Sequence, residues 1–137
     1  MKVLFLDIDG VVNCSTTPTR SDNFIGIDPY MALLVGRIID ATGCAVVLSS
    51  SWRYHEESMN EVRRRVCGFV DVTPKNNGLT SRGTEIKAWL EFHPEVTRHA
   101  ILDDNTDFLD DQPLFKTTWD KGLTDEIANS VITYLNA

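Results

Sequence analysis

The segment KVLFLDIDGVV at residues 2–12 decides the fold class. Its first five residues, Lys2 to Leu6, form an apolar run of strand length, which is typical of a strand buried on both faces of a sheet. Strands of that kind belong to parallel sheets covered by helices. The run ends at Asp7, and Asp9 follows after a single residue. The segment therefore predicts a buried parallel strand that carries two carboxylates at its carboxyl end.

The rest of the chain alternates strand-length apolar runs with stretches of helical periodicity. Asp28 and Pro29 supply a side-chain cap and a proline at the first helical position, and Gly43 ends that helix. Further strands are predicted at 44–48, 69–72, 99–102 and, more weakly, 115–118, and helices at 29–42, 52–65, 82–92 and 125–135. We predict one domain over residues 1–137, an α/β doubly wound three-layer sandwich with a mostly parallel five-stranded sheet.

The composition excludes several functional classes. Thirteen Lys and Arg against 20 Asp and Glu give a net charge of −7, which argues against a non-specific binder of nucleic acid. No apolar stretch approaches the roughly 18–20 residues that cross a bilayer, so we expect neither a membrane span nor a secretory signal. The three cysteines show no C-x-x-C spacing, which favours a reducing cytoplasm over a disulfide framework or a zinc site.

Polar side chains follow three of the predicted strands at the point where each ends. They are Asp7 and Asp9 after the first strand, Ser49 after the second, and Asp103 and Asp104 after the fourth. Neighbouring parallel strands end at one edge of the sheet, so these side chains should gather there. Carboxylates held together need a compensating cation, and an all-oxygen site suits Mg²⁺. Because a hard cation shields a carboxylate from an anionic substrate, phosphoryl transfer is the leading chemistry.

A bound phosphoryl group also needs hydrogen-bond donors and a fixed positive charge. The Ser49 hydroxyl and the backbone N–H groups around residues 49–51 form a predicted anion site. Arg82 stands at the predicted start of the third helix, and Lys87 lies about one and a half turns further along. Both remain candidates for the cation.

These residues resemble the four motifs of the haloacid dehalogenase (HAD) superfamily, in order. The segments that carry the resemblance are FLDIDGVV at 5–12, VLS at 47–49, a basic residue on the next helix, and ILDD at 101–104. More narrowly, VLSSSWR at 47–53, RGTEIKAWL at 82–90 and ILDDNTDF at 101–108 resemble the HAD-like domain of Swiss Army Knife RNA repair proteins. The resemblance covers nearly the whole chain and implies a HAD-like Rossmannoid fold.

The resemblance implies a phosphatase that works through an aspartyl phosphate. Asp7 would be the nucleophile, and Asp9 would be the general acid and then the general base. Ser49, with Arg82 or Lys87, would hold the phosphoryl oxygens. The implied Mg²⁺ ligands are the Asp7 carboxylate, the Asp9 backbone carbonyl, Asp104, and Asp103 directly or through water.

The chain has no room for the full cap domain that many HAD proteins carry, which predicts an open site. An open site favours a large substrate such as a polynucleotide end. Trp52 could stack on a base, although a Trp early in a helix more commonly packs in the core. The candidate substrate contacts are Gly10, Asn13, Ser50, Trp52 and Arg53, with Arg20 and His55 as further candidates.

Other functions stay open at this point. The substrate could instead be a small metabolite or a nucleotide, and a non-catalytic phosphate-binding module could use the same fold. A receiver-type phosphoacceptor needs its phosphorylated Asp after a central strand, and the D-x-D-G after the first strand does not fit that order. A glycosyltransferase needs a nucleotide-binding half, which the sequence does not indicate. The pattern makes no prediction of oligomeric state.

Overall fold

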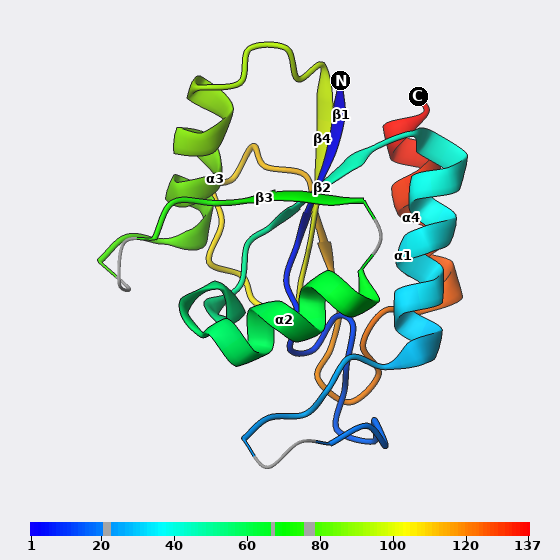
Figure 1. The fold of residues 1–137 in the computed structure, drawn as a ribbon. Coiled ribbons are helices and arrows are strands. Elements are labelled where there is room, and N and C mark those ends of the chain that lie inside the picture. Colours follow the sequence, from blue (N-terminus) through cyan, green and yellow to red (C-terminus); the bar gives the residue numbers. More distant parts are fainter. Residues whose placement is uncertain (21–22, 67, 76–78) are drawn as a thin grey trace.

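A parallel β-sheet forms the centre of the computed structural model, which describes residues 1–20, 23–66, 68–75 and 79–137 (Figure 1). The strands are β1 (Lys2–Leu6), β2 (Ala45–Leu48), β3 (Phe69–Val72), β4 (Arg98–Asp103) and β5 (Leu114–Lys116). All neighbours pair in parallel, in the order β3-β2-β1-β4-β5. The helices are α1 (Pro29–Thr42), α2 (Glu56–Arg65), α3 (Arg82–Glu91) and α4 (Asp125–Leu135), with a 3₁₀ turn, η1 (Ser51–Tyr54).

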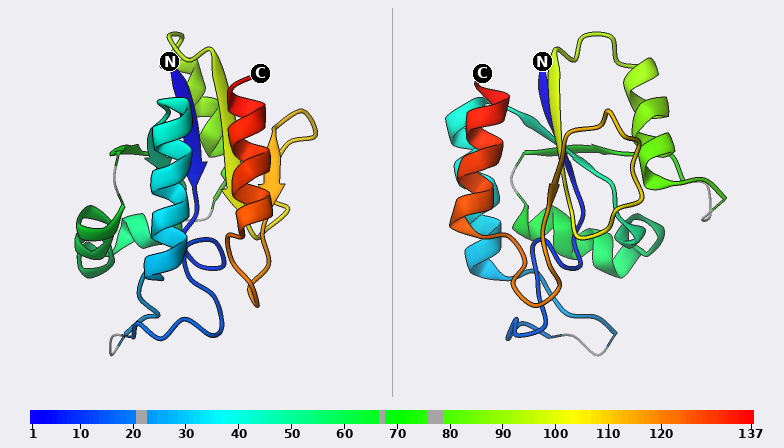
Figure 2. Two further views of the ribbon diagram at one scale, coloured as in Figure 1. Left: turned by 90° about the vertical axis from the view of Figure 1, so that its right-hand side faces the viewer. Right: turned by 180° about the vertical axis from the view of Figure 1, so that it is seen from behind.

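The sheet is covered on both faces, which confirms the predicted doubly wound α/β class. Helices α1 and α4 pack side by side on one face, and α3 packs on the other (Figure 2). Alternate residues of β1 point to opposite faces. Leu4 and Leu6 join the core under α1 and α4, whereas Val3 and Phe5 join Trp89 of α3 in a second core.

The register of the three central strands brings their carboxyl ends level. Leu6 pairs with Leu48 of β2 on one side and with Leu102 of β4 on the other. The ladder then continues for one more step: the Asp7 N–H donates to the Leu102 carbonyl (3.0 Å) and the Ser49 N–H donates to the Leu6 carbonyl (2.8 Å). The residues that follow β1, β2 and β4 therefore begin at the same edge of the sheet.

The predicted helix 52–65 is wrong at its first turn, where the chain forms η1 and then restarts as α2. His55 lies between them with extended backbone, at φ −125° and ψ 123°. The Ser58 hydroxyl is 3.1 Å from the Trp52 carbonyl and 3.0 Å from the His55 carbonyl, and so satisfies groups that a continuous helix would have used itself. The break turns Trp52 and Arg53 into the protein.

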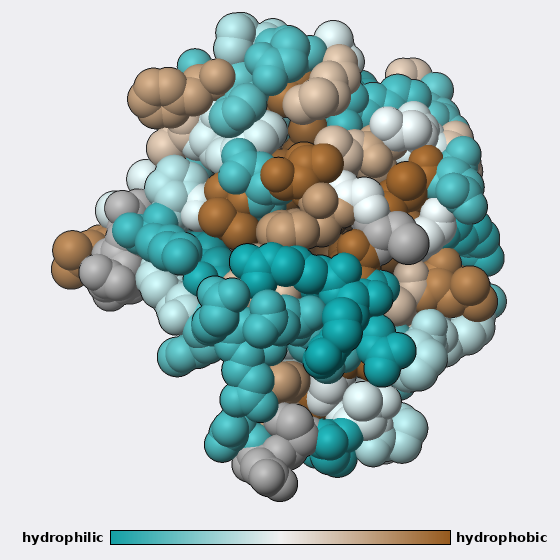
Figure 3. Space-filling model, in the orientation of Figure 1, coloured by the Kyte–Doolittle hydropathy of each residue, from teal (hydrophilic) through white to brown (hydrophobic). Residues whose placement is uncertain are grey.

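The surface over α2 is hydrophilic in the view of Figure 3. Arg63 pairs with Glu56, and Arg64 and Arg65 both pair with Glu61, so these arginines form ion pairs on the helix surface. Within the described part of the chain, no helix is both long and apolar enough to cross a membrane.

Candidate active site

Three carboxylates gather where β1 and β4 end. Oxygen atoms of Asp7, Asp103 and Asp104 all lie within 4.8 Å of one another. Asp7 is 3% exposed, Asp103 is fully buried and Asp104 is half-buried. Burial raises the pKa of Asp7 well above its usual range, and the charge of Asp103 raises it further. The cluster is therefore short of positive charge, which is the condition under which acids bind a cation.

Arg82 supplies part of that positive charge. Its Nη1 donates to Asp103 Oδ2 (2.8 Å) and lies 3.1 Å from Asp7 Oδ1 as an ion pair without hydrogen-bond geometry. Burial disfavours the guanidinium charge, but the attraction of the two aspartates outweighs it and holds the pKa of Arg82 above its usual value. One side chain thus contacts two of the three acids.

The start of α3 is fixed so that Arg82 reaches the acids. Its backbone N–H donates to Asp107 Oδ2 (3.2 Å), and the next N–H, of Gly83, donates to the Asp107 carbonyl (3.0 Å). A Cβ on Gly83 would stand 2.9 Å from Phe108 Cα, so α3 packs closely on the loop after β4. Lys87, the other predicted cation, is exposed further along α3 and lines a separate cavity. The structure therefore brings Arg82 to the acids and leaves Lys87 away from them.

Gly10 is a backbone requirement of the site. Its φ is +82°, and a Cβ at this position would lie 2.1 Å from Asp104 Oδ2. The Gly10 N–H donates to Asn13 Oδ1 (3.0 Å), and its carbonyl accepts from the Thr117 hydroxyl (2.5 Å). Gly10 is buried. Gly10, predicted as a substrate contact, thus forms a tight turn that packs against the Asp104 side chain.

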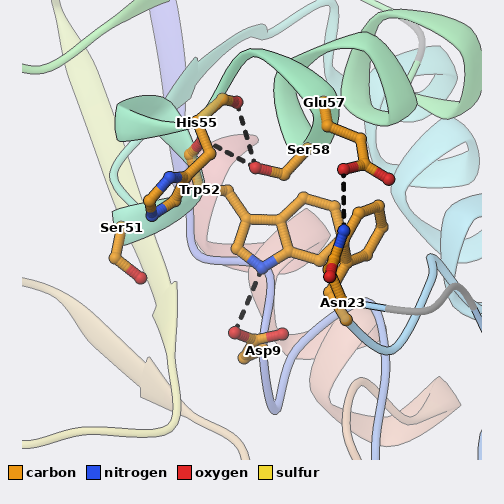
Figure 4. A pocket seen from close by; sticks show the side chains of 8 residues that line it. Asp9, Asn23, Ser51, Trp52, His55, Glu57 and Ser58 are labelled. Carbon is orange, nitrogen blue, oxygen red and sulfur yellow. Dashed lines mark hydrogen bonds between the residues drawn. The ribbon is translucent and has the colours of Figure 1, made fainter.

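Asp9, the residue before this turn, is exposed, and both of its carboxylate oxygens accept hydrogen bonds. Asn13 Nδ2 donates to Oδ1 (3.0 Å) and Trp52 Nε1 donates to Oδ2 (3.1 Å), the second bond being drawn in Figure 4. Asn13 is fully buried and Trp52 is 5% exposed, with the Phe24 ring edge-on at 4.9 Å between centroids. Both are predicted substrate contacts. In the structure their polar groups donate to Asp9, and Trp52 also lines a cavity beside it.

Two buried polar atoms at the ends of β1 and β2 have no hydrogen-bond partner. They are Asp7 Oδ1 and Ser49 Oγ. A buried acceptor or hydroxyl left unpaired is costly, and such atoms mark places where a ligand completes the bonding. Ser50 differs, because its hydroxyl accepts from the Trp52 N–H (3.1 Å) and caps η1. Ser49 therefore has a hydroxyl available to a bound anion, whereas the Ser50 hydroxyl is engaged.

Arg53, a predicted substrate contact, forms a buried ion pair and also lines a cavity beside Arg82. Its guanidinium is buried, and Nη2 lies 2.9 and 2.8 Å from the two carboxylate oxygens of Glu85 on α3. Its Nη1 donates to the Ser50 carbonyl (2.7 Å). The pair ties the turn after β2 to the helix that carries Arg82. Nothing in the spacing of the sequence singles out Glu85, which reads as an ordinary helical acid.

Two cavities open beside the site, one on the Asp9 side and one on the Arg82 side. The first has a volume of about 380 Å³ and is lined by Asp9, Asn23, Phe24, Ser51, Trp52, His55, Glu57 and Ser58. The second has about 230 Å³ and is lined by Ser51, Arg53, Tyr54, Thr80, Arg82, Glu85 and Asp107. His55, a further predicted contact, lines the first cavity. Arg20 instead donates to the Ser15 carbonyl (3.2 Å).

Comparison with known families gives one match that covers most of the chain. The family described as the HAD domain in Swiss Army Knife RNA repair proteins matches residues 3–128. Comparisons with curated proteins and with solved structures found no match. The matched range includes every acid of the cluster, Arg82, and both residues that hold Asp9.

Proposed function

The chain belongs to the HAD domain family of Swiss Army Knife RNA repair proteins, and on that premise we propose that it is a Mg²⁺-dependent phosphatase acting through an aspartyl phosphate on Asp7. The observation that carries the proposal is the cluster of Asp7, Asp103 and Asp104, three carboxylates that gather beside Arg82. A structural ion pair needs no third acid. A nucleophile with a cation site needs several carboxylates together.

Each residue of the site has a part in this reaction. Asp7 attacks phosphorus and forms the new O–P bond, while the bond from phosphorus to the ester oxygen breaks. Asp9 gives its proton to that leaving oxygen, then takes a proton from the water that hydrolyses the aspartyl phosphate. Arg82 and the Ser49 hydroxyl hold the phosphoryl oxygens. Inorganic phosphate leaves and the Asp7 carboxylate is restored.

The donor set of the cluster fits Mg²⁺. Its members are all oxygen donors, which is the preference of that ion, and their negative charge exceeds what Arg82 alone can offset. Asp7, Asp103 and Asp104 would hold the ion, with the backbone carbonyl of Asp9. When bound, Mg²⁺ supplies positive charge that lowers the repulsion between the Asp7 carboxylate and an anionic phosphate.

The family's description, which names RNA repair, supports a substrate derived from nucleic acid. We infer that the phosphate belongs to a nucleotide unit, either the end of a strand or a mononucleotide. A panel of 3′- and 5′-phosphorylated oligonucleotides, mononucleotides and sugar phosphates tests this inference. Faster turnover of sugar phosphates than of every nucleotide would contradict it and would leave the phosphatase assignment standing.

The proposed reaction is tested by phosphate release from an aryl phosphate in Mg²⁺, in a chelator, and after Asp7→Asn. We expect release only by the unchanged protein in Mg²⁺. Thermal unfolding gives a second readout, because an ion that binds only the folded state raises the melting temperature. We expect Mg²⁺ to stabilise the protein and Asp104→Asn to remove that effect. Activity that persists in the chelator would overturn the mechanism.

A further inference from the structure

We propose that the cavity beside Asp9 binds the leaving group of the phosphoester, and that it takes one uncharged nucleoside, so that nucleoside monophosphates are preferred over phosphorylated strands. This inference rests on the proposed function and narrows its substrate. It concerns the cavity that Asp9 lines and that none of the three clustered acids lines. The cavity is the 380 Å³ one that Asp9 and Trp52 line.

The position of Asp9 decides which cavity receives the leaving group. A general acid must touch the oxygen that leaves, so the departing alcohol has to lie on the side of Asp9. Figure 4 shows the Asp9 carboxylate at the edge of the cavity, hydrogen-bonded to the Trp52 indole, with residues of η1 and α2 on one wall and Asn23 on the other. The cavity next to Arg82 has no contact with Asp9.

The cavity has room for one unit of the leaving group. Small-molecule sites typically measure about 300–1,000 Å³, and 380 Å³ lies near the lower end of that range. One nucleoside or sugar is of this size, whereas two linked nucleotides are not. A strand end would have to place its second nucleotide outside.

The lining suits a nucleoside better than a plain sugar. Phe24 and Trp52 meet edge-on with ring centroids 4.9 Å apart and form an aromatic wall, on which a planar base can pack. Ser51 and His55 supply polar groups of the kind that bind ribose hydroxyls. Glu57 accepts a hydrogen bond from Asn23 Nδ2 (3.1 Å), which joins the two walls.

The charge of the cavity argues against a strand. Two carboxylates, of Asp9 and Glu57, line it, and none of its described lining residues is Lys or Arg. Arg53, which follows Trp52 in the chain, turns away to Glu85. The phosphodiester that follows a terminal nucleoside would therefore approach the Glu57 carboxylate, with no described Lys or Arg in the lining to pair it. Proteins that bind strands instead neutralise phosphates with Lys and Arg.

The experiment compares substrates that differ by one nucleotide in the leaving group. Adenosine 3′-monophosphate is paired with the 3′-phosphorylated dinucleotide of adenosine, and the 5′ pair is made in the same way. At low salt we expect kcat/KM to be about fivefold or more higher for each mononucleotide. Glu57→Lys should shrink this ratio. The matched control is Glu56→Lys, the same charge change at a neighbouring residue that pairs with Arg63 outside the cavity, and it should leave the ratio near its original value.

Binding of adenosine alone separates this inference from the proposed function. Titration followed by NMR should shift the indole N–H signal of Trp52, which is identified by its absence from Trp52→Phe. Adenosine that binds without any phosphatase activity would support a nucleoside site in the cavity and would refute the proposed function and, with it, the leaving-group role. Active protein that ignores adenosine, processes strands as fast as mononucleotides, or responds equally to Glu56→Lys and Glu57→Lys would overturn the cavity assignment alone.

Discussion

Asp7 and Asp9 are separated by one residue, yet they occupy opposite environments. Asp7 is buried among two further acids and Arg82, whereas Asp9 is exposed and accepts hydrogen bonds from two uncharged donors. The first environment concentrates charge and calls for a cation. The second holds a carboxylate in place while leaving it in contact with solvent. Identical side chains thus acquire a nucleophile's and a proton donor's setting from their surroundings alone.

The largest effect is expected from substitution of Asp7, in the buried environment. Asp7→Asn keeps the size of the side chain and removes the nucleophile, so phosphate release should fall by about 10⁴-fold or more for every substrate. Asp9→Asn is the comparison. It should lose less activity on aryl than on alkyl phosphates, because aryl leaving groups need little protonation, while the slower hydrolysis of the aspartyl phosphate lowers the rate for both. Steady-state kinetics on aryl and alkyl phosphates measure both. Equal losses on all substrates in the two variants would erase the distinction between the sites.

The second largest effect is expected at the Arg53–Glu85 ion pair, which joins η1 to α3. Arg53→Ala leaves Glu85 as a buried, unpaired charge, and should lower the free energy of unfolding by about 3–5 kcal/mol. Arg63→Ala removes an exposed pair with Glu56 and should cost about 1 kcal/mol or less. Urea unfolding measures both. A loss for Arg53→Ala as small as that for Arg63→Ala would show that the buried pair does not hold η1 to α3.

A smaller effect is expected when the turn at Gly10 is altered. Gly10→Ala forces a Cβ into the space of the Asp104 carboxylate and adds about 1–2 kcal/mol of backbone strain at positive φ. We expect about a hundredfold loss of activity and a weaker stabilisation by Mg²⁺. Gly36→Ala is the control, since nothing lies within 4 Å of its added Cβ and helix propensity should make it neutral or stabilising. Full activity in Gly10→Ala would mean that Asp104 can move without consequence.

The smallest effect is expected at Trp52, which donates a hydrogen bond to the exposed Asp9. Trp52→Phe removes the N–H that orients Asp9 and keeps most of the apolar packing, so kcat should fall about tenfold on alkyl phosphates and much less on aryl phosphates. Trp89→Phe makes the same chemical change at an equally buried indole, one that donates to Asp71 instead. It should leave the dependence on leaving group unaltered. A uniform loss across substrates in Trp52→Phe would assign Trp52 to packing only.

The sequence predicted the fold well because the relevant signals are local. Apolar runs and the Asp28-Pro29 start mark strands and helices through their own periodicity, and residues that end parallel strands necessarily share an edge. The break at His55 was missed because it depends on the Ser58 hydroxyl bonding back to two carbonyls. Residues 52–65 have a composition compatible with one helix, so the sequence does not indicate that this hydroxyl bonds to two carbonyls.

The candidate site was predicted unevenly for the same reason. Asp7, Ser49, Asp103 and Asp104 follow from strand ends, and the choice between Arg82 and Lys87 needed only the position of α3. The partners of Asp9 could not be predicted. Trp52 lies 43 positions from Asp9, and Arg53 meets Glu85 across 32, so no spacing rule connects them. The catalytic roles of all these residues stay predictions.

The contact between Gly10 and Asp104 has a consequence for how the protein folds. These residues are far apart in the chain, and they meet only because β1 and β4 pair at the centre of the sheet. Closing so long a loop is entropically slow compared with forming a helix. We therefore expect the acids to come together only after the central strands have paired. A divalent ion that needs all three acids would bind the complete fold and would not bind partly folded chains. Metal binding could then be used to follow refolding.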